Sequence, residues 1–140
     1  MEKHQHNFRV FYADTDQMGV MYHANYIKYF ELGRTELLRS CGLVYQKLEK
    51  EGLMTPVINL EVKYIKPAFY DQILTVYTWV SSLKNARIEF SYELQNEDGD
   101  TLTIAKTQLV FLDVNTKRPA NHFADELKQK INHYIIQQKA

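Results

Sequence analysis

From residue 58 onward, four segments with the alternating pattern of β-strands follow one another with only short breaks between them. In the first segment every second side chain is apolar, which is typical of a strand with one buried face. Asp98-Gly99 favours a tight hairpin turn before the last segment, because glycine accepts positive φ. The predicted strands are residues 58–64, 73–80, 88–94 and 101–112.

One long helical pattern precedes these strands. Apolar or small residues recur at spacings of three and four from Tyr26 to Cys41, which predicts a helix over about residues 24–40 with one buried face. Gly42 is a suitable stop, since glycine tolerates the left-handed conformation that ends many helices. Gly33 lies mid-helix, where glycine costs about 1 kcal/mol relative to alanine, so we expect the helix to approach the sheet closely there.

Shorter elements complete the pattern: a first strand at residues 7–12, a helical turn or two at 44–51 and a terminal helix at about 123–137. Consecutive antiparallel strands with one apolar face need a cover, and the long helix is the obvious one. The chain therefore predicts an α+β fold. Its 140 residues contain no linker or repeat, so we expect a single domain spanning residues 1–140.

Composition disfavours several classes of function. Lysine plus arginine and aspartate plus glutamate number 17 each, and this balance argues against a nucleic-acid partner. The single cysteine, Cys41, rules out an internal disulfide, and its place on the buried helix face favours a packed thiol over a nucleophile. The first residues lack an apolar leader and no stretch approaches 18 consecutive apolar residues. We therefore expect a cytoplasmic protein that does not insert into membranes.

The most reactive residue types gather between the first strand and the long helix. Residues 12–26 hold two aspartates, a histidine, three tyrosines and a glycine. Free N–H groups at a helix N-terminus carry about half a positive charge and could polarise the carbonyl of an ester or thioester. A nearby carboxylate could attack that carbonyl or activate water. On pattern alone, however, Asp16 is more often a turn aspartate that accepts local N–H groups.

This stretch resembles the signature of the 4-hydroxybenzoyl-CoA thioesterase-like branch of hotdog-fold acyl-CoA thioesterases, and most of all its small bacterial acyl-CoA thioesterases. The resemblance runs from about Phe8 to about Pro119. It implies a curved antiparallel sheet wrapped around a central helix, paired into homodimers or homotetramers, acting on acyl-CoA or acyl-carrier protein without metal or cofactor. The matching residues are Asp14-Thr15-Asp16-x-x-Gly19-x-x-Tyr22-His23-x-Asn25-Tyr26, Phe30-Glu31, Arg34, Val62-x-Tyr64-x-x-Pro67-Ala68 and Tyr70-Asp71.

The resemblance also implies roles for individual residues. Asp16 matches the catalytic carboxylate, as nucleophile or general base, and Asp14 matches a supporting position. His23 and Tyr12 match site residues, with an oxyanion hole at the helix N-terminus near His23. The hydroxybenzoyl-specific relatives have another residue at the position of His23, which favours ordinary acyl groups as substrates.

The expected substrate-binding residues come from two parts of the chain. Tyr22 and Asn25 belong to the signature itself. Lys84 and Arg87 are expected at the nucleotide end of coenzyme A, where phosphate charge favours cations. Glu31 is a reserve catalytic acid, although with Arg34 it would also form an i,i+3 surface pair.

Other functions have less support. No G-x-S-x-G, H-E-x-x-H, G-x-G-x-x-G or P-loop motif occurs, which disfavours serine hydrolase, zinc protease and nucleotide-binding folds. An EF-hand loop starting at Asp14 would place Met18 and Asn25 at ligand positions. Two alternatives on the same fold stay open: a non-catalytic acyl-carrier or cell-envelope accessory protein, and a dehydratase or hydratase.

Overall fold

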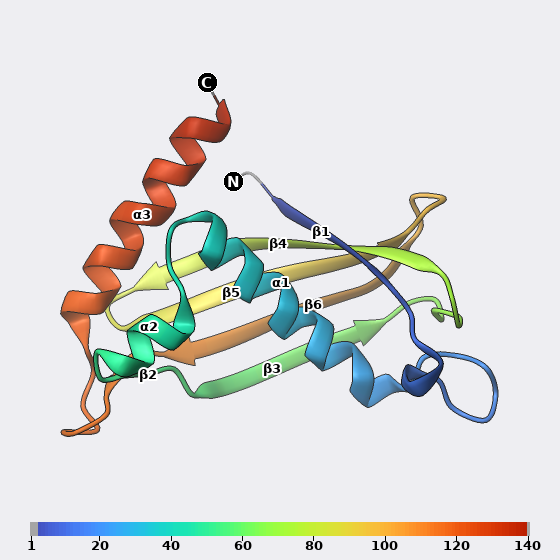
Figure 1. Ribbon diagram of the computed structural model, residues 1–140, viewed down its shortest axis with the longest axis horizontal. Coiled ribbons are helices and arrows are strands. Elements are labelled where there is room, and N and C mark those ends of the chain that lie inside the picture. The colour runs from blue at the N-terminus through green and yellow to red at the C-terminus, as the bar shows by residue number, and fades with distance from the viewer. Residues whose placement is uncertain (1–2, 140) are drawn as a thin grey trace.

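A computed structural model describes residues 3–139 of the chain, with side chains described for residues 3–134. Figure 1 shows one long helix, α1, crossing one face of an antiparallel sheet. The elements in chain order are β1 (His4–Arg9), 3₁₀ turns at Tyr12–Asp14 and His23–Asn25, α1 (Tyr26–Ser40), α2 (Tyr45–Lys50), β2 (Leu53–Met54), β3 (Val57–Tyr64), β4 (Ile73–Lys84), β5 (Arg87–Asn96), β6 (Thr101–Val110), β7 (Leu112–Asp113) and α3 (Asn121–Lys139).

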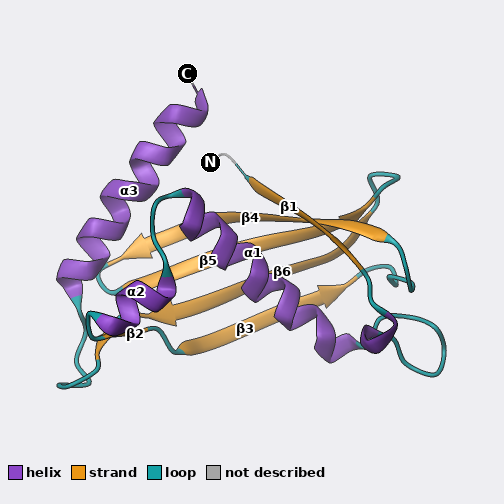
Figure 2. Cartoon of the chain, viewed as in Figure 1, coloured by secondary structure: helices purple, strands orange, loops and turns teal. Residues whose placement is uncertain are grey.

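The sheet has the strand order β1-β4-β5-β6-β3, and every neighbouring pair is antiparallel. A second, two-stranded ladder joins β2 to β7. The long helix α1 lies against the concave face, and α3 stands at the end of the sheet where β4 finishes (Figure 2). The predicted hotdog fold, with its additional C-terminal helix, is confirmed.

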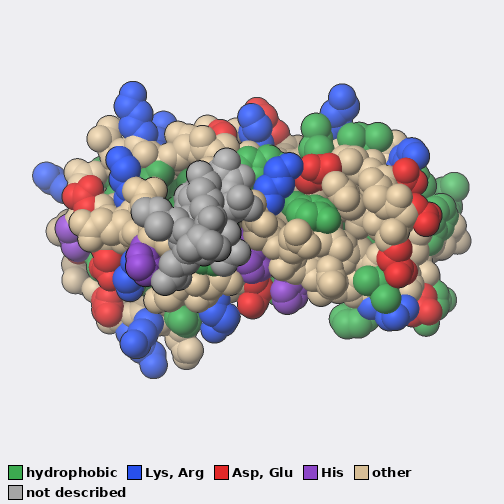
Figure 3. Space-filling view, turned by 90° about the horizontal axis from the view of Figure 1, so that it is seen from above, with side chains coloured by type: hydrophobic (Ala, Val, Ile, Leu, Met, Phe, Trp, Pro, Cys, Tyr) green, Lys and Arg blue, Asp and Glu red, His purple; other side chains and the backbone are tan. Residues whose placement is uncertain are grey.

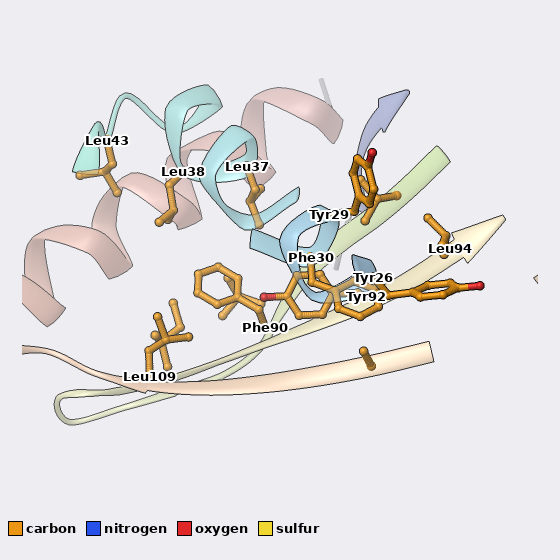
Figure 4. Close-up of a cluster of buried hydrophobic side chains, with 14 of the residues drawn as sticks. Tyr26, Tyr29, Phe30, Leu37, Leu38, Leu43, Phe90, Tyr92, Leu94 and Leu109 are labelled. Carbon is orange, nitrogen blue, oxygen red and sulfur yellow. The ribbon is translucent and has the colours of Figure 1, made fainter. Parts of the chain in front are cut away.

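The core lies between α1 and the inner faces of the central strands. The Phe30 ring of α1 packs at 5.0 Å, centroid to centroid, from the Tyr92 ring of β5, as Figure 4 shows. Alternate side chains of β5, including Phe90 and Leu94, are fully buried on the same face. The period-two pattern of this strand therefore buries one face under the helix.

Gly33 lies where α1 approaches β4 most closely. A Cβ atom added there would collide with Thr78 Oγ1 and lie 3.1 Å from Val76 Cγ2. The close approach predicted from this mid-helix glycine is confirmed.

Gly33→Ala is expected to lower the free energy of unfolding by up to about 2 kcal/mol, because overpacking a core costs about 1–3 kcal/mol and alanine recovers about 1 kcal/mol of helix propensity. Urea denaturation measures the change. Thr78 Oγ1 has no hydrogen-bond partner among the described residues. Adding Thr78→Ala should therefore restore most of the lost stability, and a double variant no more stable than Gly33→Ala would contradict this explanation.

The long helix was expected to cover the apolar face of the whole sheet, but it leaves part of the apolar face of β3 uncovered. Leu60 pairs with Thr107, whose buried side chain faces α1, so the apolar side chains of β3 lie on the helix side of the sheet. Ile58, Leu60 and Tyr64 nevertheless remain 46%, 37% and 45% exposed. Because β3 is an edge strand, its apolar face continues beyond the reach of α1.

Several boundaries differ from prediction; β4, for example, continues to Lys84 rather than ending at Val80. The first strand ends at Arg9 rather than near residue 12, because a 3₁₀ turn forms at Tyr12–Asp14 with the Asp14 N–H donating to the Phe11 carbonyl at 2.9 Å. The final helix starts two residues earlier than expected, at Asn121. No described helix is long and apolar enough to cross a membrane.

Candidate active site

A short antiparallel ladder shapes the acidic loop between β1 and α1. The Tyr22 N–H donates to the Asp14 carbonyl at 2.8 Å, and the Asp16 N–H donates to the Val20 carbonyl at 2.9 Å. Gly19 closes the turn with φ of +80°, a conformation that favours glycine. The ladder holds the segment carrying Asp16 beside the segment that leads into the helix.

The Asp16 carboxylate lies in solvent at the tip of this ladder. Its Oδ1 accepts the Met18 N–H at 2.8 Å, which is the Asx-turn geometry expected of a turn aspartate. No described residue donates to Oδ2. One carboxylate oxygen is thus oriented by the loop, while the other is available to a substrate or water.

The helix start that follows the acidic loop is a 3₁₀ turn, His23–Asn25, that runs directly into α1. Tyr64 OH donates to the His23 carbonyl at 2.6 Å, and the Asn25 N–H donates to the Tyr22 carbonyl at 2.9 Å. Within the described residues, the exposed N–H groups of His23 and Ala24 have no acceptor. Two unpaired donors at a helix start can bind an oxyanion.

Asp14 anchors the loop to the helix through both its side chain and its main chain. Its buried carboxylate accepts Lys28 Nζ, Tyr29 OH and the Phe11 N–H, the last at 3.2 Å. Burial raises the pKa of this carboxyl, but the bonds from Lys28 and Tyr29 outweigh burial, so the net pKa is lowered. The Asp14 carbonyl also accepts Asn25 Nδ2 at 2.9 Å.

Comparison with known proteins identifies the family of this chain. Residues 10–131 match the thioesterase-like superfamily. The chain belongs to that superfamily. It is 37% identical over 128 residues to acyl-CoA thioesterase YbgC of Haemophilus influenzae, covering 89% of this chain and 91% of the relative. It is also 33% identical to a DHNA-CoA thioesterase from Staphylococcus aureus, whose structure matches with a TM-score of 0.85 over 95% of each chain.

These relatives make the protein an enzyme of the thioester-hydrolase class. The acidic loop and the start of α1 fall within the matched region. The predicted acid and histidine therefore lie on the fold that the resemblance implied, although their catalytic roles stay a prediction.

Tyr12 is exposed, like the other predicted catalytic residues of this thioesterase, Asp16 and His23. It is 78% exposed, and its ring packs edge-on against the Tyr70 ring at 5.5 Å. The His23 ring packs against the Tyr22 ring at 4.4 Å. Phe11 and Met18 of the same loop are also exposed. Figure 3 shows hydrophobic side chains on the surface at the right-hand end of the molecule.

Lys84 and Arg87 lie at the other end of the sheet. They flank the β4–β5 turn, in which Asn85 adopts a φ of +55°, and line a cavity of about 640 Å³ together with Asn121 at the start of α3. The 12 residues of β4 span roughly 36 Å between this turn and the end that carries Asp16. A single chain therefore does not bring the two predicted parts of the site together (Figure 1).

Arg34 does not form the predicted surface pair with Glu31. Glu31 is exposed, whereas the Arg34 side chain is partly buried next to Tyr45 of α2 and Tyr92 of β5. No ion pair joins Arg34 to a carboxylate among the described residues. The expectation of an i,i+3 pair is therefore wrong for these two residues.

Two features of the site escaped sequence reasoning. Tyr64 bonds to a turn 41 residues away, and no local pattern signals such a contact. Lys28 and Tyr29 bind Asp14 from the first turn of α1, although Lys28 carries no motif of its own. An aspartate followed 14 and 15 residues later by a lysine and a tyrosine is informative only once the loop between them is known to fold back.

Proposed function

We propose that the protein hydrolyses acyl-CoA thioesters to the free acid and coenzyme A. The observation that carries the proposal is the ladder between Asp14 and Tyr22, because the loop it shapes carries both an exposed carboxylate and two unpaired N–H groups. The thioester carbonyl would accept the N–H groups of His23 and Ala24, and charge developing on its oxygen would be stabilised there.

Asp16 would then act in one of two ways. As a nucleophile, a carboxylate oxygen bonds to the acyl carbon, the carbon–sulfur bond breaks, and water hydrolyses the resulting mixed anhydride. As a general base, the carboxylate takes a proton from water while the water oxygen attacks the carbon. The thiolate leaves readily in both cases, so His23 and Tyr12 are assigned to orienting the reactants, with Tyr22 and Asn25 beside them.

The exposed β3 edge supports a homodimer as the working unit. Two β3 strands paired antiparallel about a two-fold axis extend the sheet and cover the apolar face that α1 leaves open. The end of β3 lies near the His23 turn, and its start lies near the β4–β5 turn. Antiparallel pairing therefore brings the partner's Lys84 and the partner's Arg87 towards the Asp16 end, where they would bind coenzyme A phosphates.

The direct test is a thiol-release assay over acyl-CoAs of increasing chain length and over aromatic acyl-CoAs, since the S. aureus relative is named for an aromatic substrate. The same acyl groups attached to acyl-carrier protein test whether the enzyme accepts that carrier in place of coenzyme A. Turnover with at least one thioester is expected. Tight binding without hydrolysis of any of them would favour the non-catalytic binding protein.

Leu60→Glu is expected to convert the dimer to monomers, because a charge at the centre of the β3 face cannot be buried unpaired. Thiol release should fall with it, since the site loses the partner's cations. Sedimentation and light scattering measure the mass. Ile104→Lys is the matched control, because Ile104 is 41% exposed on the opposite face of the neighbouring strand. Loss of dimers in both variants, or in neither, would contradict pairing through β3.

A further inference from the structure

The Tyr64 hydroxyl contacts one of the two peptide units that carry the unpaired N–H groups. Tyr64 is the last residue of β3, and its hydroxyl donates to the His23 carbonyl at 2.6 Å, 41 residues away in sequence. That carbonyl belongs to the same peptide unit as the Ala24 N–H. In a planar trans peptide the C=O and N–H point in opposite directions, so a bond that fixes the carbonyl also fixes the direction of the N–H.

The two unpaired donors are held in different ways. The His23 N–H shares its peptide unit with the Tyr22 carbonyl, which accepts the Asn25 N–H at 2.9 Å inside the same 3₁₀ turn. The peptide unit of the Ala24 N–H is instead held by a side chain from the sheet. A carbonyl oxygen has two lone pairs, so the phenol can bond to it without displacing a helical hydrogen bond. The direction of the Ala24 N–H therefore depends on Tyr64.

The Tyr64 side chain is itself held in place. Its ring packs edge-on against the Tyr26 ring, with the centroids 5.0 Å apart and the planes at 81°. Tyr26 is buried, and its hydroxyl accepts the Ala68 N–H at 3.3 Å. Burial raises the pKa of Tyr64 above its usual value of 10.0, so the hydroxyl keeps its proton at neutral pH. The His23 carbonyl thus meets a donor of fixed orientation.

A hydrogen bond to the carbonyl side of a peptide unit also strengthens the donor on its N–H side. Each bond in such a chain polarises the next, by about 10–30% per bond. The gain is largest when the acceptor is negatively charged, because hydrogen bonds to charged groups are the stronger ones. Negative charge develops on the thioester oxygen in the transition state, so the phenol should affect kcat more than KM.

We propose that Tyr64 is a positioning residue for thioester hydrolysis, whose hydroxyl orients and polarises the peptide unit between His23 and Ala24 so that the Ala24 N–H stabilises the oxyanion. The inference rests on the proposed thioesterase function and deepens it. Tyr64 acts through this peptide unit, not by contact with the substrate. The edge strand β3 thereby takes part in the reaction from behind the helix start.

Tyr64→Phe tests this role, because it keeps the ring and removes only the hydroxyl. With octanoyl-CoA and benzoyl-CoA as substrates, kcat should fall about tenfold, less than the 10²–10³-fold cost of losing a whole oxyanion donor, and KM should stay within about twofold. Sedimentation should give the wild-type mass. Tyr77→Phe is the matched control: Thr78 next to it faces α1, so Tyr77 lies on the opposite face of the sheet, and its loss of a hydroxyl should change neither constant.

An unchanged kcat, a rise in KM alone, or a changed mass for Tyr64→Phe would overturn the assignment. Infrared spectra of the same two thioesters, labelled with ¹³C at the carbonyl and bound to Asp16→Asn, give a readout that needs no turnover. The bound carbonyl stretch should lie below its frequency in water, and part of that shift should be lost when Tyr64→Phe is added.

The two readouts separate the inference from the function on which it rests. If the wild type hydrolyses neither thioester while the carbonyl shift depends on the Tyr64 hydroxyl, hydrolysis of these acyl-CoAs is contradicted and the positioning role is supported. If the wild type hydrolyses them but the shift is the same with and without the hydroxyl, the positioning role is wrong. A carbonyl stretch that is unshifted in both proteins also overturns it.

Discussion

Replacing Asp16 with asparagine is expected to lower kcat for thioester hydrolysis by about 10²–10⁴-fold, the usual contribution of a positioned acid or base. The amide can neither attack the acyl carbon nor take a proton from water. Asparagine still offers an oxygen to the Met18 N–H, so the loop should keep its shape. Thiol release under saturating acyl-CoA measures kcat. The free energy of unfolding should change by less than about 0.5 kcal/mol, as is usual for substitutions at exposed positions.

Asp98→Asn is the matched control, since it changes an equally exposed aspartate in the β5–β6 turn. It should turn over at the wild-type rate. If Asp16→Asn also keeps the wild-type rate, Asp16 is not the catalytic carboxylate.

If Asp16→Asn loses activity, a single turnover of the wild type in ¹⁸O-water tests for the nucleophilic mechanism. Only the nucleophilic route can place label in the Asp16 side chain, so label found there would establish that route.

Asp14→Asn is expected to lower the free energy of unfolding by about 2 kcal/mol, and kcat by tenfold or more. The hydrogen bonds from Tyr29 and from the Phe11 N–H are buried, and bonds to a charged group contribute about 1.5–3 kcal/mol. Lys28 is 53% exposed, so its ion pair with Asp14 adds little. Activity falls because the Asp14 side chain holds the loop that carries Asp16 against the first turn of α1, through Lys28 and Tyr29. Chemical denaturation and thiol release measure the two effects.

The stabilisation by the Asp14 carboxylate should decrease as the pH falls. The pKa of Asp14 is lowered from its usual value of 3.8, so the stabilisation is fully present above that value and is lost as pH falls through the lower folded-state pKa. The unfolding free energies of wild type and Asp14→Asn should therefore converge below about pH 4. A difference that stays constant down to pH 2 would show that the charge of Asp14 is not what stabilises the loop.

The long elements could be predicted from sequence because each has a period long enough to recognise. The helix at Tyr26–Ser40 and the strand at Arg87–Asn96 repeat their apolar residues over several turns or pleats. The two-residue strands Leu53–Met54 and Leu112–Asp113 are too short to show a period, and only their pairing reveals them.

The site was predictable in part, for a different reason. The motif places Asp16 and His23 next to a helix start, and the ladder between them is local in sequence. Periodicity does not say which end of a strand lies near which loop, so only the topology shows that Lys84 and Arg87 lie at the opposite end of the sheet from Asp16. Spacing also does not show that Arg34 faces inwards. With Glu31 three residues before it, the sequence is equally compatible with an ion pair on the surface of the helix.

The uncovered face of β3 has a consequence for how much enzyme a cell or a test tube must contain. In the proposed dimer, a carboxylate on one copy and cations on its partner meet only when two molecules associate, so the rate per molecule would depend on total protein and fall on dilution by mass action. Reaction progress at nanomolar protein should then show a lag or a steep, greater than linear dependence on enzyme added. Scarcity of the protein itself would keep thioesters intact without any inhibitor.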